Sequence, residues 1–161
     1  MKPFLRRGFL ALAIMLALAI PANSEPFEDG KAAYERGDYA TALRLLRPLA
    51  ALRHADAQHN LGNMYRKGEG VPQDFAEAAT WHRKAADQGL ANAEFSLGII
   101  YANGTGVPQD ILMAHMWFSL AAASGLESAR ENLDPVARAM PPDQITEAQR
   151  IIREWQAKHQ Q

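Results

Sequence analysis

A 36-residue internal repeat constrains this chain more than any other feature of its sequence. Residues 55–89 can be written above residues 91–125, and identical residues then recur at a constant offset of 36. A short repeated unit cannot bury its own apolar face, so such units stack on one another. The matched positions, which we interpret as structural, are Leu61, Gly62, Tyr65, Gly68, Gly70, Asp74, Ala78 and Trp81 in the first copy and Leu97, Gly98, Tyr101, Gly104, Gly106, Asp110, Ala114 and Trp117 in the second.

Each copy predicts a helix–turn–helix. In the first copy, apolar and small residues recur at helical spacing over 55–67. Gly68 and Gly70 can adopt positive φ and so end that helix and turn the chain. Pro72 marks the gap, and Asp74 is a natural N-cap for a second helix over about 75–88. No segment of the sequence has the alternating pattern of a strand.

Weaker echoes of the repeat extend in both directions along the chain. They predict an all-α fold, a short right-handed α-solenoid of about four hairpins with a C-terminal capping helix. The predicted helices are 26–36, 39–51, 55–67, 74–88, 91–103, 110–124, 127–138 and 143–158. The corresponding units are a hairpin at 26–51, repeat 1 at 55–89, repeat 2 at 91–125 and a capping hairpin at 127–158.

The motif A-x-x-x-L-G-x-x-Y-x-x-G-x-G-V-x-x-D-x-x-x-A-x-x-W-x-x-x-A-A-x-x-G occurs twice, nearly in full, over 55–125. It resembles the Sel1-like repeat, a relative of the tetratricopeptide repeat, and the hairpin at 26–51 is more similar to the tetratricopeptide type. The resemblance implies a binding or adaptor module, with an exported bacterial member as the expected type. Cysteine-rich relatives have been linked to β-lactam binding, but this chain has no Cys, so that activity is not expected here.

The first 24 residues have the pattern of a secretory signal peptide. Lys2, Arg6 and Arg7 precede an apolar run from Phe9 to Ile20, and small residues then lead to a predicted cleavage after Ser24. An uncleaved anchor is the alternative, but 12 helical residues rise only about 18 Å against about 30 Å of hydrocarbon core. Both the general secretory and the twin-arginine routes remain open. We therefore expect residues 25–161 to act in the periplasm or outside the cell, with no stable membrane span after cleavage.

Composition excludes several functions. Without Cys the chain cannot form disulfides, thiolate zinc sites or iron–sulfur clusters. A net charge of −1 argues against nucleic acid as the main partner. The glycine loops lack the Lys-Ser/Thr of a phosphate-binding loop, and no nucleophile motif is present. We expect no cofactor, no metal site and no enzymatic activity.

The five histidines do not change this expectation. His54 and His59 are five residues apart, which does not place them on one helix face, whereas a two-His metal site needs an i, i+4 pair with further ligands.

Binding in a concave groove is the remaining hypothesis. In solenoids of the resembled type, the first helix of each hairpin lines the concave face. Asparagine amides there can both donate and accept hydrogen bonds with a peptide backbone. Phe95 and Ile99 would form an apolar patch in the groove, or they pack against the neighbouring repeat; the sequence leaves both open. The predicted groove residues are His59, Asn60, Asn63, Lys67, Asn92, Phe95, Ile99, Asn103 and Asn132.

Two functions from different classes follow. The first is a protein–protein interaction module of the cell envelope, an adaptor or regulator that binds a peptide or protein of unknown identity. The second is an envelope protein that handles a small molecule or a glycan, with or without weak hydrolase activity. Four hairpins offer a small surface, so homo-oligomerisation is open as well.

Overall fold

In the computed structural model, residues 26–159 form eight α-helices and no strand. The predicted signal segment, residues 1–24, lies outside the described residues. The helices are α1 (Pro26–Glu35), α2 (Tyr39–Ala51), α3 (Ala55–Lys67), α4 (Phe75–Ala86), α5 (Ala91–Asn103), α6 (Ile111–Ala123), α7 (Glu127–Arg138) and α8 (Pro142–His159).

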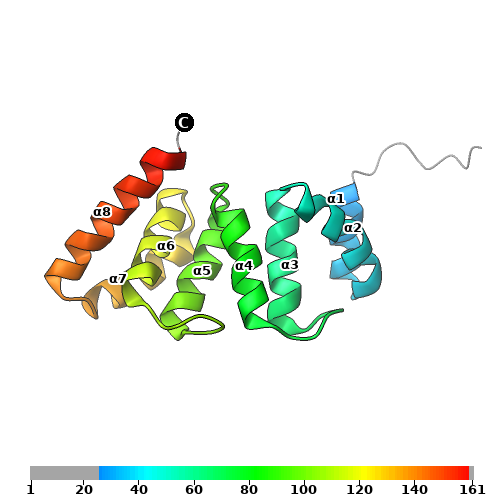
Figure 1. The fold of residues 1–161 in the computed structure, drawn as a ribbon, viewed down its shortest axis with the longest axis horizontal. Helices are drawn as coiled ribbons and strands as arrows, with labels where there is room; N and C mark the ends of the chain where they lie inside the picture. The colour runs from blue at the N-terminus through cyan, green and yellow to red at the C-terminus, as the bar shows by residue number, and fades with distance from the viewer. Residues whose placement is uncertain (1–25, 160–161) are drawn as a thin grey trace, which may run out of the picture.

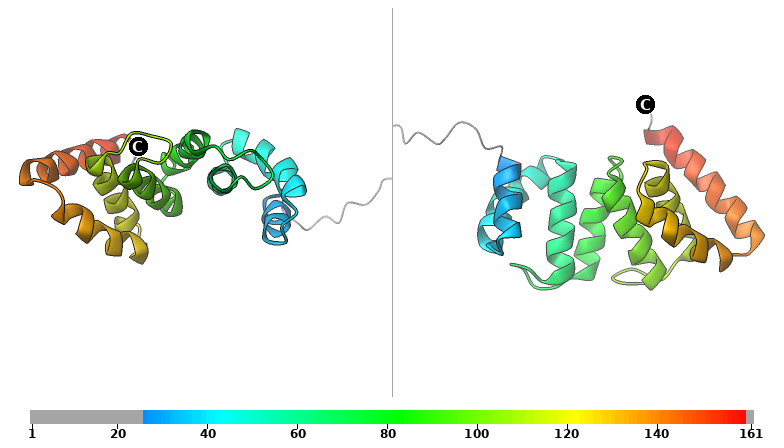
Figure 2. Two further views of the ribbon diagram at one scale, coloured as in Figure 1. Left: turned by 90° about the horizontal axis from the view of Figure 1, so that it is seen from below. Right: turned by 180° about the vertical axis from the view of Figure 1, so that it is seen from behind.

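The helices form antiparallel hairpins that stack side by side along one axis (Figure 1). Neighbours in sequence are neighbours in space: α1 packs on α2, α3 on α4, and α5 on α6, while α2 packs on α3 and α4 on α5. Seen from below, the stack follows an arc with the odd-numbered helices along its inner side (Figure 2, left). The predicted all-α solenoid is confirmed.

Local chemistry sets the helix ends. Asp74 and Asp110 cap α4 and α6, each accepting a hydrogen bond from the backbone N–H three residues on, at 2.9 and 3.0 Å. Gly68 and Gly104 end α3 and α5 in the left-handed conformation. α4 ends at Ala86, two residues earlier than predicted, because the chain tightens into a turn there before it reaches Gly89.

Small residues allow the two helices of each repeat to approach closely. Gly62 of α3 faces the ring of His82, and Gly98 of α5 faces the ring of Phe118; a Cβ at either glycine would lie 2.5–2.7 Å from the ring. Buried alanines line both helices of each pair, among them Ala57, Ala78, Ala93 and Ala114. The glycine or alanine at these positions leaves room for a large side chain opposite, so the core interlocks.

The two long loops are built alike and attach each repeat to the hairpin before it. Gly70, at φ +75°, packs against Tyr39 and Leu43 of α2, and Gly106, at φ +77°, packs against the backbone of Phe75 and Ala76 in α4. We call these loops, residues 68–74 and 104–110, the straps.

α8 packs chiefly on α6 rather than on α7, its partner in sequence. Trp155 meets Trp117 edge to face at 5.9 Å between ring centroids, and Ile151 and Ile152 join the same core cluster. α8 thus covers apolar surface of the second repeat that a further repeat would otherwise bury. Over the part of the chain described, no helix is long and apolar enough to span a bilayer.

Candidate functional site

The residues predicted to form a groove lie on odd-numbered helices along the inner side of the arc, which we call the inner face. Those helices are α3, α5 and α7. The structure divides these residues into two regions. The α1–α3 end is polar and hydrogen-bonded, whereas the α5 end carries apolar side chains.

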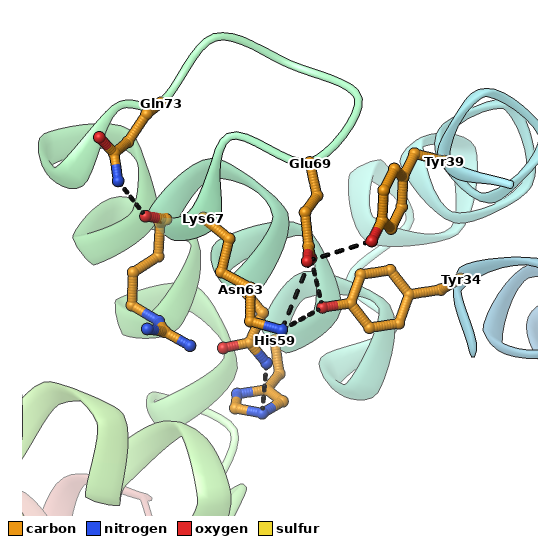
Figure 3. Close-up of polar contacts among 8 residues, drawn as sticks. Tyr34, Tyr39, His59, Asn63, Lys67, Glu69 and Gln73 are labelled. Carbon is orange, nitrogen blue, oxygen red and sulfur yellow. Dashed lines mark hydrogen bonds and ion pairs between the residues drawn. The ribbon is translucent and has the colours of Figure 1, made fainter. Parts of the chain in front are cut away.

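A polar cluster lies where α1 meets the end of α3 (Figure 3). Tyr34 donates to one Glu69 carboxylate oxygen at 2.6 Å, and Tyr39 donates to the other at 3.2 Å. Lys67 donates to the Tyr34 hydroxyl at 2.9 Å and lies 3.6 Å from Glu69. These four residues come from α1, α2, α3 and the first strap, so the cluster ties the first hairpin to the second.

The cluster has a definite charge state. Partial burial and the hydrogen bond to Glu69 raise the pKa of Tyr34, so its hydroxyl stays protonated. Partial burial would raise the pKa of Glu69, but its hydrogen bonds from Tyr34 and Tyr39 and the nearby Lys67 ammonium together lower it. The hydrogen bond to Tyr34 raises the pKa of Lys67. At neutral pH the cluster therefore presents a paired carboxylate and ammonium beside two phenol rings.

His59 and Asn63 continue this strip along α3 (Figure 3). The Asn63 amide nitrogen lies 3.1 Å from His59 Nε2, while His59 Nδ1 is buried without a partner. The His59 ring also contacts His82 of α4, at 5.0 Å between centroids. Burial lowers the pKa of His59, and burial with the neighbouring His59 lowers the pKa of His82 to about 3, so both rings are neutral at pH 7.

Phe95 and Ile99 have different environments. The Phe95 ring lies 5.7 Å from Phe118 and packs against the cluster that Ala121 and Ala129 belong to. It therefore packs on α6 of its own repeat, in a cluster that continues onto α7, although part of its surface remains open. Ile99 is 39% exposed and is one of the few large apolar side chains that face solvent in the described residues.

The remaining predicted positions are polar. Asn92 and Asn103 are exposed at the two ends of α5, and Asn60 is half-buried on α3. Asn132 is half-buried on α7, and its amide donates to the Ser128 carbonyl of its own helix at 2.8 Å, which leaves its oxygen free to accept.

This geometry suits non-covalent binding. Among residues 26–159, no group of three or more His, Asp or Glu side chains is placed to hold a metal ion. The inner face offers amide donors and acceptors, one ion pair and an exposed isoleucine, which are the groups that recognise an extended peptide.

Sequence reasoning did not assign Tyr39, Glu69 or His82 to this surface. Glu69 lies in a loop between two glycines, and its partners come from helices 30 and 35 residues away. The repeat alignment could have pointed to His82, because the second copy has a different ring, Phe118, at the equivalent position.

Comparison with known proteins agrees with this architecture. The Sel1 repeat family model matches residues 55–90 and 91–126. No curated protein matches the chain. Similar solved structures include the protective antigen c5321 of uropathogenic Escherichia coli, which displays an SLR fold (TM-score 0.78, 31% identity), and a Sel1 repeat protein from Oxalobacter formigenes (TM-score 0.64, 33% identity). The matches cover 83% and 66% of this chain but only 30% and 44% of those two chains.

Proposed function

The chain is a Sel1-repeat protein with two matched repeats, and we propose that it is a protein-interaction module that binds a peptide segment on its inner face. Sel1-repeat folds commonly serve as protein–protein interaction modules, and the family is generally non-catalytic. The proposed role is accordingly that of a non-enzymatic adaptor or regulator.

One observation carries this proposal: small and apolar residues that recur identically in the two repeats are buried, whereas the residues on the inner face differ between them. Leu61, Ala78 and their equivalents 36 residues on are identical and fully or almost fully buried. On the inner face, Asn63 corresponds to Ile99 and Lys67 to Asn103. Residues needed only for stacking would repeat, so the variation supports a surface shaped for a ligand that is itself irregular.

The chemistry of the face indicates the ligand. The exposed Ile99 suits one apolar side chain of the peptide, and the asparagines suit its backbone. At the other end, the Lys67–Glu69 pair is partly exposed, so a charged peptide residue could exchange with either member. We propose an extended segment with an apolar anchor toward α5 and a polar or charged end toward α1.

A crosslinking capture from envelope extract tests this. The parent protein is compared with an inner-face variant that carries Ile99→Lys and Asn103→Glu, both exposed and one helical turn apart on α5. Phe95 is left unchanged because its packing on Phe118 would confound loss of binding with loss of folding. We expect a captured protein that the inner-face variant loses by about tenfold or more.

The matched control carries the same two changes on the outer side, Ala76→Lys and Thr80→Glu, also exposed and one turn apart on α4. It should capture the partner as the parent does, and circular dichroism should show all three proteins equally helical. Equal capture by both variants would refute the inner face as the site. If no protein is captured, while cell-wall fragments raise the melting temperature, the glycan-handling alternative replaces the adaptor.

We also propose that the protein acts outside the cytoplasm. The charged, apolar and small-residue zones of residues 1–24 support export. Cell fractionation with N-terminal sequencing tests it: an envelope protein that begins at Glu25 is expected, and an intact Met1 in the cytoplasm would refute it.

A further inference from the structure

A second concave site lies away from the inner face, where the turn after α4, the end of α6 and the end of α8 meet. These three segments come together along the upper edge in Figure 1. They line an open cavity of about 370 Å³, within the size range of small-molecule sites. Its lining includes Asp87, Glu94, Ser124 and Trp155.

Glu94 is unusual in this cavity. Its side chain belongs to α5 and is only 2% exposed, yet its Oε2 atom has no hydrogen-bond partner. A buried carboxylate without a partner is strongly unfavourable, so the site is incomplete as it stands. The indole N–H of Trp155, which lines the same cavity, is also buried without an acceptor.

The first repeat shows what a completed site looks like. Gln58 is the equivalent of Glu94, and it donates to the Ala50 carbonyl at 2.9 Å while it accepts from the Gln88 amide at 2.7 Å. In the second repeat, Ser124 stands where the first has Gln88, so the long amide donor is missing. The first repeat has a hollow of about 310 Å³ at this place too, but Gln58 and Gln88 in its lining bond to each other, and Lys84 and Arg53 add positive charge. The second repeat thus has a carboxylate without a donor where the first has a neutral amide with its partners.

The charge around the cavity indicates its ligand. Asp87 adds a second carboxyl group, and of the described lining residues none is Lys or Arg. A ligand must therefore donate hydrogen bonds and carry positive charge to complete the site. Trp155 and His159, whose rings stack at 4.1 Å, both line the cavity and supply aromatic surface for a short hydrocarbon chain.

We propose that this cavity binds a small organic cation, a primary ammonium group on a short apolar chain, with the ammonium on Glu94. The ammonium donates to Glu94 Oε2, and the chain lies along Trp155. This site is separate from the inner face and does not depend on the function proposed for that face.

Calorimetric titration of the purified protein tests the proposal with three probes of one size: n-butylammonium, n-butanol and n-butyrate. We expect n-butylammonium to bind one to one with a Kd of the order of 1 mM, and the neutral and anionic probes to bind at least about tenfold more weakly. Glu94→Gln should weaken n-butylammonium by about tenfold or more and still fold, since Gln58 occupies the same place in the first repeat.

The matched control is Asp56→Asn, which removes one negative charge at an exposed site where the second repeat already has Asn92. It should leave the affinity for n-butylammonium unchanged. This result would distinguish an effect of the Glu94 carboxylate from an effect of the protein's overall negative charge.

A second readout does not rely on heat. Burial raises the pKa of Glu94 to about 7, and a bound ammonium should lower it, which carbon-detected NMR of the carboxyl group would follow. The proposal is overturned if n-butylammonium fails to bind at about 100 mM, if n-butanol binds as well, if Glu94→Gln binds as the parent does, or if the Glu94 pKa does not move.

Discussion

The two Sel1 repeats place different ring pairs at one position. In the first repeat, His59 of α3 meets His82 of α4 at 5.0 Å; in the second, Phe95 of α5 meets Phe118 of α6 at 5.7 Å. A glycine on the first helix makes room for the ring of the second helix in both. The backbone arrangement is thus shared, while the chemistry of the side chains it holds is not.

This difference teaches that shape and polarity are set separately in a repeat of this kind. An imidazole fits where a phenyl ring fits, but both nitrogens of His82 are buried without a hydrogen-bond partner. Such a group destabilises the fold relative to an apolar one of similar size. The first repeat therefore carries a pH sensitivity that the second repeat lacks at this position.

The same separation holds at Gln58 and Glu94. The neutral amide of the first repeat is fully engaged, and the carboxyl group of the second is not. Both repeats thus leave buried polar atoms without partners, on His59, Trp81 and His82 in the first and on Glu94 and Trp117 in the second.

The largest effect should come from the straps. In Gly106→Ala, the new Cβ would overlap the Phe75 carbonyl group, and φ of +77° is strained for alanine, so we expect a loss of about 3 kcal/mol or more in unfolding free energy. Gly70→Ala meets a side chain rather than backbone first and should lose about 2 kcal/mol. Gly89→Ala has open space and should lose only about 1 kcal/mol. Urea denaturation measures all three; equal losses would contradict tight packing of the second strap.

The next effect concerns the ring pairs. His59→Phe with His82→Phe gives the first repeat the apolar pair of the second. Burial lowers the pKa of His82 to about 3, so as pH falls below 6.5 the unfolded chain takes up the proton first and stability is lost. Between pH 7.5 and pH 5 the His82 contribution is about 2 kcal/mol, and the double variant should lack it.

Urea midpoints of the parent and the double variant at the two pH values test this. Parallel loss of stability in both proteins would show that other groups dominate the acid response. Loss of helix in the double variant at pH 7.5 would show that the first repeat cannot hold the larger rings.

An effect of similar size is expected at Glu94. Burial raises the pKa of its carboxyl group to about 7 from 4.5, so stability present below pH 4.5 is lost as pH rises through 7. Glu94→Gln should therefore stabilise the protein by about 1–3 kcal/mol at pH 8 and have little effect at pH 4.5. The reciprocal change, Gln58→Glu, should destabilise the protein most at pH 8. Thermal denaturation of both variants at pH 4.5 and pH 8 measures these changes, and a change of the opposite sign in either variant would contradict the prediction.

The smallest effect is at Arg53. It adopts φ of +67° in the turn before α3, where the following turns have Gly89 and Gly125. Arg53→Gly relieves this strain but raises the conformational entropy of the unfolded chain. We therefore expect a net increase of about 0.5–1 kcal/mol in the free energy of unfolding. Urea denaturation measures this change. A loss of stability would mean that the contacts of the arginine side chain stabilise the fold by more than its backbone strain destabilises it.

The helices of this fold could be predicted because their boundaries are encoded locally. Asp74 and Asp110 cap the starts of α4 and α6, and Gly68 and Gly104 end α3 and α5. Each of these residues acts on backbone groups only a few positions away. The docking of α8 on α6 and the Tyr34–Glu69 bond could not be predicted, because they depend on how hairpins far apart in sequence meet. Phe95 stayed ambiguous for the same reason: its spacing fits both an inner surface and a contact between repeats.

The straps have a consequence for how such a chain can grow. Each 36-residue unit carries, in its own loop, the glycine that seats it on the unit before it. A tandem duplication of residues 55–90 would therefore produce a copy that already carries its strap glycine. That glycine would pack on the second helix of the preceding copy, as Gly106 packs on α4. Lengthening the array then requires no new interface to evolve, only new side chains on the face that each added copy brings.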